Sequence, residues 1–126
     1  MGTPRPTPAE LEILRVLWER GPSTVRDVQE VLQRARRTGY TTVLKLLQIM
    51  TEKGLVSRDE NARAHVYQAR LGQSQTQRQL VRDLVDRAFG GSVASLVAQA
   101  LSGRRTASAE ITKIRLLMDD LEGREQ

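Results

Sequence analysis

The side chains best suited to chemistry in this chain are basic, and they gather in one stretch of the sequence. Residues 31–58 contain six lysine or arginine side chains against a single glutamate, and this excess of five equals the formal net charge of all 126 residues. Positive charge concentrated in this way favours polyanionic partners, first nucleic acid and second an anionic membrane surface. A solvated basic face without a partner is the alternative that charge alone leaves open.

Other kinds of chemistry find little support in the sequence. The chain has no cysteine and a single histidine, His65, which excludes disulfides, thiolate metal sites and multi-histidine metal centres. The neighbouring carboxylates Glu10 and Glu12, or Asp119 and Asp120, are more simply explained as solvated helix charges than as an acid–base pair. No glycine-rich phosphate-binding loop occurs. We therefore expect no enzyme activity, no cofactor and no metal.

Three short helices are predicted in and before the basic stretch. Residues 7–10 (Thr-Pro-Ala-Glu) and 24–27 (Thr-Val-Arg-Asp) have the spacing of capping boxes, which start helices. After a polar loop at residues 34–39, a third helix is expected from about Thr41 to Lys53, ended by a C-cap glycine. The apolar residues at helical spacing, which we expect to face inward, are Leu11, Leu14, Leu17, Trp18, Val25, Val28, Val31, Leu32, Val43, Leu44, Leu47 and Met50.

A β-hairpin is predicted directly after these helices. Residues 55–58 and 64–68 are rich in β-forming side chains, and the polar residues 59–63 connect them. Because two strands alone are rarely stable, the hairpin must pack on the helices. The side chains expected to make this contact are Leu55, Val56, Val66 and Tyr67. A helix-turn-helix followed by a hairpin is the layout of a winged helix.

From about Ser74 the sequence changes to three amphipathic helices, interrupted at Gly90-Gly91 and at residues 102–105. Ser92 is expected to cap the second of them, and Ser108 or Thr106 the third. A segment of about 55 residues rarely buries enough apolar area alone, so we expect it to pack against a second copy of itself. The expected dimerisation residues are Leu80, Leu84, Val93, Leu96, Val97, Leu101, Ile111, Ile114, Met118 and Leu121.

The predicted fold class is therefore mainly α with a small β-hairpin. An N-terminal winged helix-turn-helix is expected over residues 7–70 and a C-terminal helical dimerisation region over residues 74–122. Two alternatives stay open for the C-terminal helices, which could fold back on the first domain or line a pocket for a small gating ligand. No apolar run approaches the roughly 20 residues that span a bilayer, and the N-terminus lacks a signal-peptide pattern. A cytoplasmic location without a membrane partner is the expectation.

Several stretches resemble the penicillinase and methicillin-resistance repressor family (the BlaI/MecI type). The resemblance rests on residues 40–47 (Tyr-Thr-Thr-Val-Leu-Lys-Leu-Leu), 53–56 (Lys-Gly-Leu-Val) and 63–67 (Arg-Ala-His-Val-Tyr). The opening also matches, at residues 10–18 and 24–28. The similarity covers residues 8–70 well and continues loosely to about residue 121. Its motifs are specific in combination, although no single one is.

The resemblance implies a winged helix with a C-terminal helical dimerisation region, and a homodimer that binds inverted repeats in promoters and blocks transcription. The helix matching Tyr40–Lys53 would enter the major groove of double-stranded DNA, and the hairpin containing Arg63 would lie near the backbone. Threonine hydroxyls and methyls suit base edges, whereas Arg36, Arg37 and Arg63 would mostly hold phosphates. The expected DNA contacts are Arg36, Arg37, Tyr40, Thr41, Thr42, Lys45 and Arg63. For Thr41 and Thr42, helix capping is the simpler role, and we expect capping and DNA contact together because the two residues are adjacent.

One part of the family pattern is missing from this chain. In the best-known family members, cleavage of an Asn-Phe bond in the C-terminal region lifts repression, whereas the nearest matching positions here are Gln99-Ala100. A sensor protease is therefore an uncertain partner, and the cysteine cluster of related copper-responsive repressors is absent. A winged-helix adaptor that binds protein instead of DNA is the competing interpretation.

Overall fold

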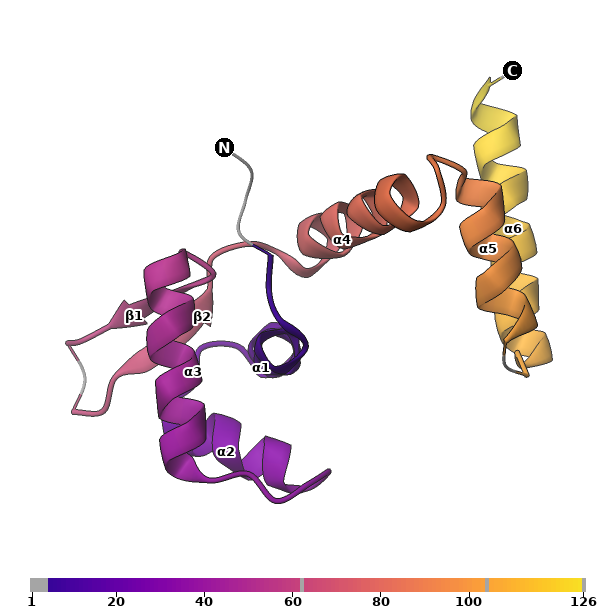
Figure 1. The fold of residues 1–126 in the computed structure, drawn as a ribbon. Coiled ribbons are helices and arrows are strands. Elements are labelled where there is room, and N and C mark those ends of the chain that lie inside the picture. The colour runs from indigo at the N-terminus through magenta and orange to yellow at the C-terminus, as the bar shows by residue number, and fades with distance from the viewer. Residues whose placement is uncertain (1–4, 62, 104, 126) are drawn as a thin grey trace. The chain divides into compact units, whose positions relative to one another are not determined.

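The computed structural model describes residues 5–61, 63–103 and 105–125, and Figure 1 shows the course of the chain. Its elements are α1 (Pro8–Arg20), α2 (Val25–Gln33), α3 (Tyr40–Lys53), β1 (Val56–Asp59), β2 (Val66–Ala69), α4 (Gln73–Ala88), α5 (Val93–Ser102) and α6 (Ser108–Glu125). The predicted fold class, mainly α with a small hairpin, is confirmed. The chain divides into two compact units, Met1–Val81 and Arg82–Gln126, and the division falls within α4.

Two capping boxes start the first two helices, as the sequence predicts. At α1 the Glu10 amide donates to Thr7 Oγ1 (3.2 Å), and the Thr7 amide donates to Glu10 Oε1 (2.8 Å). At α2 the same exchange joins Thr24 and Asp27, at 3.1 and 3.0 Å. These bonds satisfy amides that a helix otherwise leaves without partners, so both helix starts are determined locally.

The third helix begins one residue earlier than predicted. Gly39 is its N-cap, in an extended conformation and without a side-chain cap, so Thr41 and Thr42 lie inside the first turn. The expectation that these threonines cap the helix is therefore wrong. At the other end Gly54 adopts the left-handed conformation (φ 80°), which glycine reaches without strain, and the Leu55 amide donates to the Met50 carbonyl (2.9 Å).

The hairpin pairs β1 with β2 antiparallel, with Val56 opposite Ala69 and Arg58 opposite Tyr67. Each strand starts later than predicted, and Ala62 of the predicted connecting turn lies outside the described residues. The hairpin is tied to the start of α2, because Ser23 and Tyr67 exchange two backbone hydrogen bonds of 2.9 and 2.8 Å.

One predicted hairpin contact is wrong. Neighbouring residues of a strand point to opposite faces. Tyr67 is buried in the core, so Val66 lies on the other face and is only half-buried.

The core of the first unit lies between α1, α2, α3 and the hairpin, which surround it in Figure 1. Half-buried Trp18 packs against this core, and its indole N–H donates to the Leu71 carbonyl (3.0 Å), which ties α1 to the segment after the hairpin. Leu11 is likewise half-buried. The buried core residues are Ile13, Leu14, Val16, Leu17, Val25, Val28, Val43, Leu47, Met50, Leu55, Val56 and Tyr67.

The second unit differs in its burial. Gly90 (φ 58°) and Gly91 (φ 86°) end α4, and Ser92 caps α5 by accepting from the Ser95 amide (3.1 Å), both as predicted. In the predicted break at residues 102–105, Arg104 lies outside the described residues. Among the described residues from 82 to 124, Val85 is the one apolar side chain that is buried. This unit therefore has almost no apolar core within a single chain.

Candidate nucleic-acid interface

The outward face of α3 is a stripe of polar side chains at helical spacing. Thr41, Lys45, Gln48 and Glu52 follow one another at intervals of four, three and four residues, and all four are exposed. Val43, Leu47 and Met50 are buried on the opposite side and hold the helix on the core. The side chains flanking the outward stripe, also exposed, are Thr42 and Ile49.

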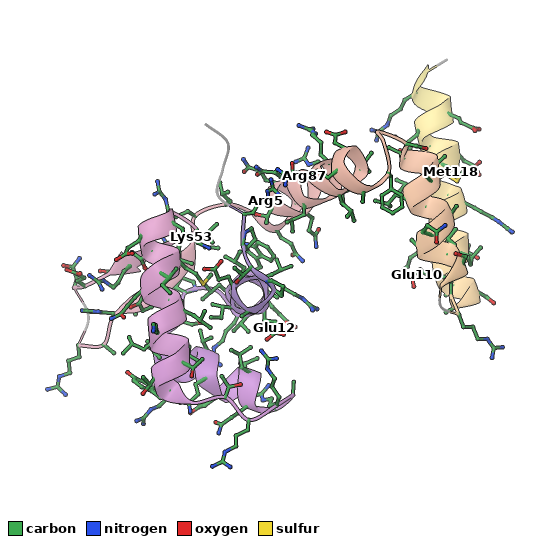
Figure 2. All side chains as sticks on the ribbon, in the orientation of Figure 1. Arg5, Glu12, Lys53, Arg87, Glu110 and Met118 are labelled. Atoms are coloured by element: carbon green, nitrogen blue, oxygen red, sulfur yellow. The ribbon has the colours of Figure 1, made fainter. Side chains whose placement is uncertain are left out.

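The C-terminal end of α3 is anchored by an ion pair that sequence reasoning missed. Lys53 Nζ donates to Glu10 Oε1 over 2.8 Å, and the Glu10 side chain is almost fully buried. Burial favours a higher pKa for Glu10, but hydrogen bonds from Lys53 and the Thr7 amide, and the Lys53 charge, outweigh it and lower the pKa. Figure 2 shows Lys53 at this end of the helix. The charge of Lys53 is thus paired within the fold.

Two further cations of the basic stretch also have acidic partners. Arg36 Nη2 lies 2.9 Å from Glu12 Oε2 of α1, and Arg58 pairs with Glu60 in the hairpin. Arg36, a predicted DNA contact, is therefore paired with a residue of α1 in the structure. Within the described part of the chain, Arg37 and Lys45 have no acidic partner, and neither has Arg34. The basic excess of residues 31–58 is smaller on the surface than the sequence count suggests.

Two hydrogen bonds that involve side chains help to hold the loop before α3. Gln29 of α2 donates through Nε2 to the Thr38 carbonyl (3.2 Å), and the Thr38 hydroxyl donates to the Arg36 carbonyl (3.1 Å). Arg37 is exposed in this loop, close in sequence to the start of α3. The loop thus places one free guanidinium near the N-terminal end of the outward stripe.

A surface hollow separates the start of α3 from the hairpin and has a volume of about 450 Å³. Tyr40 belongs to its lining, whereas Arg63 is exposed in the loop between β1 and β2. Arg26 and His65 also line the hollow, and sequence reasoning missed both. The available signal was the position of Arg26, a cation in the first turn of a capped helix. The full lining is Thr24, Val25, Arg26, Tyr40, Leu44, Ala64, His65 and Tyr67. A cation, an imidazole and a phenol together suit a backbone phosphate of a nucleic acid.

Other kinds of site are not apparent in the described residues. No group of three histidine, aspartate or glutamate side chains there could hold a metal, and no helix there is long and apolar enough to cross a membrane. A small cavity lined by Leu14, Leu55, Thr76 and neighbouring residues has a volume of about 10 Å³, which is room for about one water molecule. That space is too small for a gating ligand.

The predicted dimerisation residues differ in exposure. Leu80, Leu96, Ile111 and Ile114 are half-buried. The exposed ones are Leu84, Val93, Val97, Leu101, Met118 and Leu121, with Val93 62% exposed. Val81, Leu116 and Leu117 are also exposed and were not among them. Leu117 and Val81 belong to the apolar stripes that the helical periodicity predicts, although neither was among the expected dimerisation residues.

Comparison with known proteins identifies the family. The model of the penicillinase repressor family matches residues 6–120. The chain belongs to the penicillinase repressor family. This confirms the resemblance seen in the sequence.

Relatives of this chain match it over different lengths. The penicillinase repressor of Bacillus licheniformis is 20% identical over 123 residues, which are 98% of this chain and 96% of that protein. The transcriptional regulator BlaI of Mycobacterium tuberculosis is 42% identical over 59 residues, which are 46% of this chain and 43% of that protein. The solution structure of the DNA-binding domain of the repressor BlaI has 23% identity and a TM-score of 0.51, covering 58% of this chain and 89% of that domain. That likeness confirms the winged-helix fold.

Proposed function

We propose that this protein is a transcriptional repressor that binds an inverted-repeat operator in double-stranded DNA as a homodimer, with α3 in the major groove. The observation that supports this most strongly is the outward stripe of α3. Thr41 and Lys45 are exposed there, and neither has a side-chain hydrogen bond or ion pair within the described residues. A helix that presents unpaired polar groups at one face, while the other face is fixed to a core, suits contact with base edges.

The charges near α3 support DNA over a protein partner. Lys45 lies on the helix, Arg37 precedes it and Arg63 lies in the hairpin loop, and all three are exposed. Cations flanking a polar stripe provide phosphate contacts that orient the helix, whereas the core of a protein-binding surface is usually depleted of charge. The adaptor alternative therefore fits this surface less well.

The second unit supports the homodimer. Its helices expose apolar side chains that a lone chain does not cover, including Val93 on α5 and Met118 and Leu121 on α6. Exposed apolar patches of this kind mark interaction sites. A second copy of the same chain, related by two-fold symmetry, would bury them and would pair two winged helices for two half-sites.

Release of the repressor by cleavage at the family position is not part of the proposal. Gln99 and Ala100 lie within α5, so their backbone is helical, and neither matches the residues of the family bond. A sensor protease that cuts elsewhere stays compatible with the proposed DNA binding.

The salt dependence of DNA binding tests the proposal. The full chain is used to select duplexes from a randomised library, and its affinity for the enriched duplex is measured by fluorescence anisotropy between about 50 and 200 mM salt. Each DNA phosphate that the protein neutralises adds about −0.9 to the slope of log K against log salt, so we expect a steep negative slope. Arg37→Ala should make it shallower by about one, and the matched control Arg115→Ala on α6 should not. A flat salt dependence in the unmodified protein would reject the proposal.

A further inference from the structure

The C-terminal half of α3 has a surface unlike that of a phosphate-binding helix. After Lys45 the exposed residues of the helix are Gln48, Ile49 and Glu52. The remaining cation of this half, Lys53, is held by buried Glu10 at 2.8 Å. The carboxylate of Glu52 repels phosphates. This half of the helix therefore offers a nucleic acid an amide, an apolar side chain and a carboxylate, but no free positive charge.

Gln48 occupies the centre of this surface. It lies on the outward stripe three residues after Lys45, and within the described part of the chain its amide has no hydrogen-bond partner. The exposed amide contrasts with that of Gln29, which is used to hold the loop before α3. An unengaged glutamine amide contains a donor and an acceptor, the pair that matches N6 and N7 of adenine in the major groove.

The spacing along α3 places Gln48 opposite a different base pair from Lys45. Three residues advance about 4.5 Å along a helix axis, and successive base pairs of duplex DNA are about 3.4 Å apart. Ile49 is 36% exposed beside Gln48, and an apolar side chain in the major groove contacts the methyl group of thymine. Both side chains thus match the groups displayed by A·T pairs.

We propose that Gln48 determines operator specificity by recognising an adenine in each half-site, with Ile49 against a neighbouring thymine methyl. This rests on the proposed function, because it requires α3 to lie in the major groove. The N-terminal half of α3, up to Lys45, provides affinity for DNA in general as well as contacts to the operator. Gln48 adds sequence preference and has little effect on binding to other DNA.

Selection experiments with the full chain test this role. The unmodified protein and the Gln48→Ala, Gln48→Arg and Ile49→Ala variants each select duplexes from the same randomised library, and the enriched sequences are compared. Gln77→Ala, which removes an exposed glutamine from α4, is the matched control. Gel filtration and thermal melting show whether each variant keeps its fold and mass.

The unmodified protein and Gln77→Ala should enrich the same motif, with an adenine in each half-site. Gln48→Ala should lose the adenine preference at that position by roughly tenfold, and Gln48→Arg should change it to guanine, since arginine pairs with guanine O6 and N7. Ile49→Ala should weaken a thymine preference at the adjacent position. The affinity of Gln77→Ala for the enriched duplex should equal that of the unmodified protein.

Two other results would overturn the account at different levels. If the unmodified protein enriches a motif that both Gln48 variants reproduce, Gln48 has no part in specificity although the protein binds DNA. If the unmodified protein enriches no motif, the proposed function itself fails.

Discussion

At the scale of single residues, Glu10 connects two elements that are far apart in the sequence. Its carboxylate accepts from the Thr7 amide at the start of α1 and from Lys53 at the end of α3, while its side chain is 2% exposed. A buried carboxylate with several donors stabilises a fold, and removing its charge weakens the hydrogen bonds from those donors. Glu10 therefore fixes the end of α3 relative to α1.

Replacing Glu10 by glutamine should lower the free energy of unfolding by roughly 1–3 kcal/mol, because the charged hydrogen bonds to Lys53 and Thr7 are weakened. Urea denaturation followed by circular dichroism measures this. The matched control is Glu12→Gln, which removes the exposed pair with Arg36 and should cost less than about 1 kcal/mol. Equal losses in the two variants would show that Glu10 has no special role.

The same residue predicts a pH dependence. The folded state lowers the pKa of Glu10, so its contribution to stability is complete above the ordinary glutamate pKa of about 4.5 and is lost as the pH falls through the lower folded value. The stability difference between the unmodified protein and Glu10→Gln should therefore shrink below about pH 4.5. A difference that stays constant down to pH 3 would contradict the lowered pKa.

At the scale of elements, local signals in the sequence predict where helices start more reliably than which side chains meet across the fold. The two capping boxes and Gly54 are defined by neighbours within four residues, and all three are confirmed. The start of α3 was predicted one residue late because Gly39 has no side chain to act as a cap. The pairs Glu10–Lys53 and Glu12–Arg36 depend on the packing of separate helices, which no local pattern encodes.

The two ends of α3 predict opposite effects of adding a side chain. Gly54→Ala should destabilise the fold by about 1 kcal/mol, since φ is +80° there. Gly39→Ser should stabilise it by about 0.5–1 kcal/mol, since the backbone is extended, nothing lies within 4 Å of the new Cβ, and a hydroxyl would cap the helix. Thermal melting of both variants checks the signs, and two shifts in the same direction would contradict this description of the helix ends.

At the scale of the whole molecule, the sequence predicted the class of partner better than the number of cations that are free to contact it. The basic stretch correctly indicated the region of the helix-turn-helix, but three of its six cations have acidic partners within the fold. The C-terminal helices were predicted from periodicity alone. Their exposed apolar residues agree with the proposed dimer, which also explains why the second unit buries so little within one chain.

The two faces of α6 allow a controlled test of the dimer. Leu117 lies on the apolar stripe with Ile114 and Leu121, whereas Leu116 points to the opposite side by helical spacing, and both are exposed (59% and 64%). Leu117→Lys should therefore convert the dimer to a monomer, and Leu116→Lys should leave it intact. Analytical ultracentrifugation measures both masses. A dimer that survives Leu117→Lys, or that Leu116→Lys disrupts equally, would contradict the assigned interface.

The central claim is that the outward stripe of α3 and the side chains that flank it contact DNA. The affinity of Lys45→Ala, on the stripe, and of Thr42→Ala, beside it, for the selected duplex tests this most directly. Each variant should bind roughly 5- to 100-fold more weakly, with unchanged mass in gel filtration. The matched controls Thr112→Ala and Lys113→Ala on α6 should bind normally. Unchanged affinity of both α3 variants would contradict the claim.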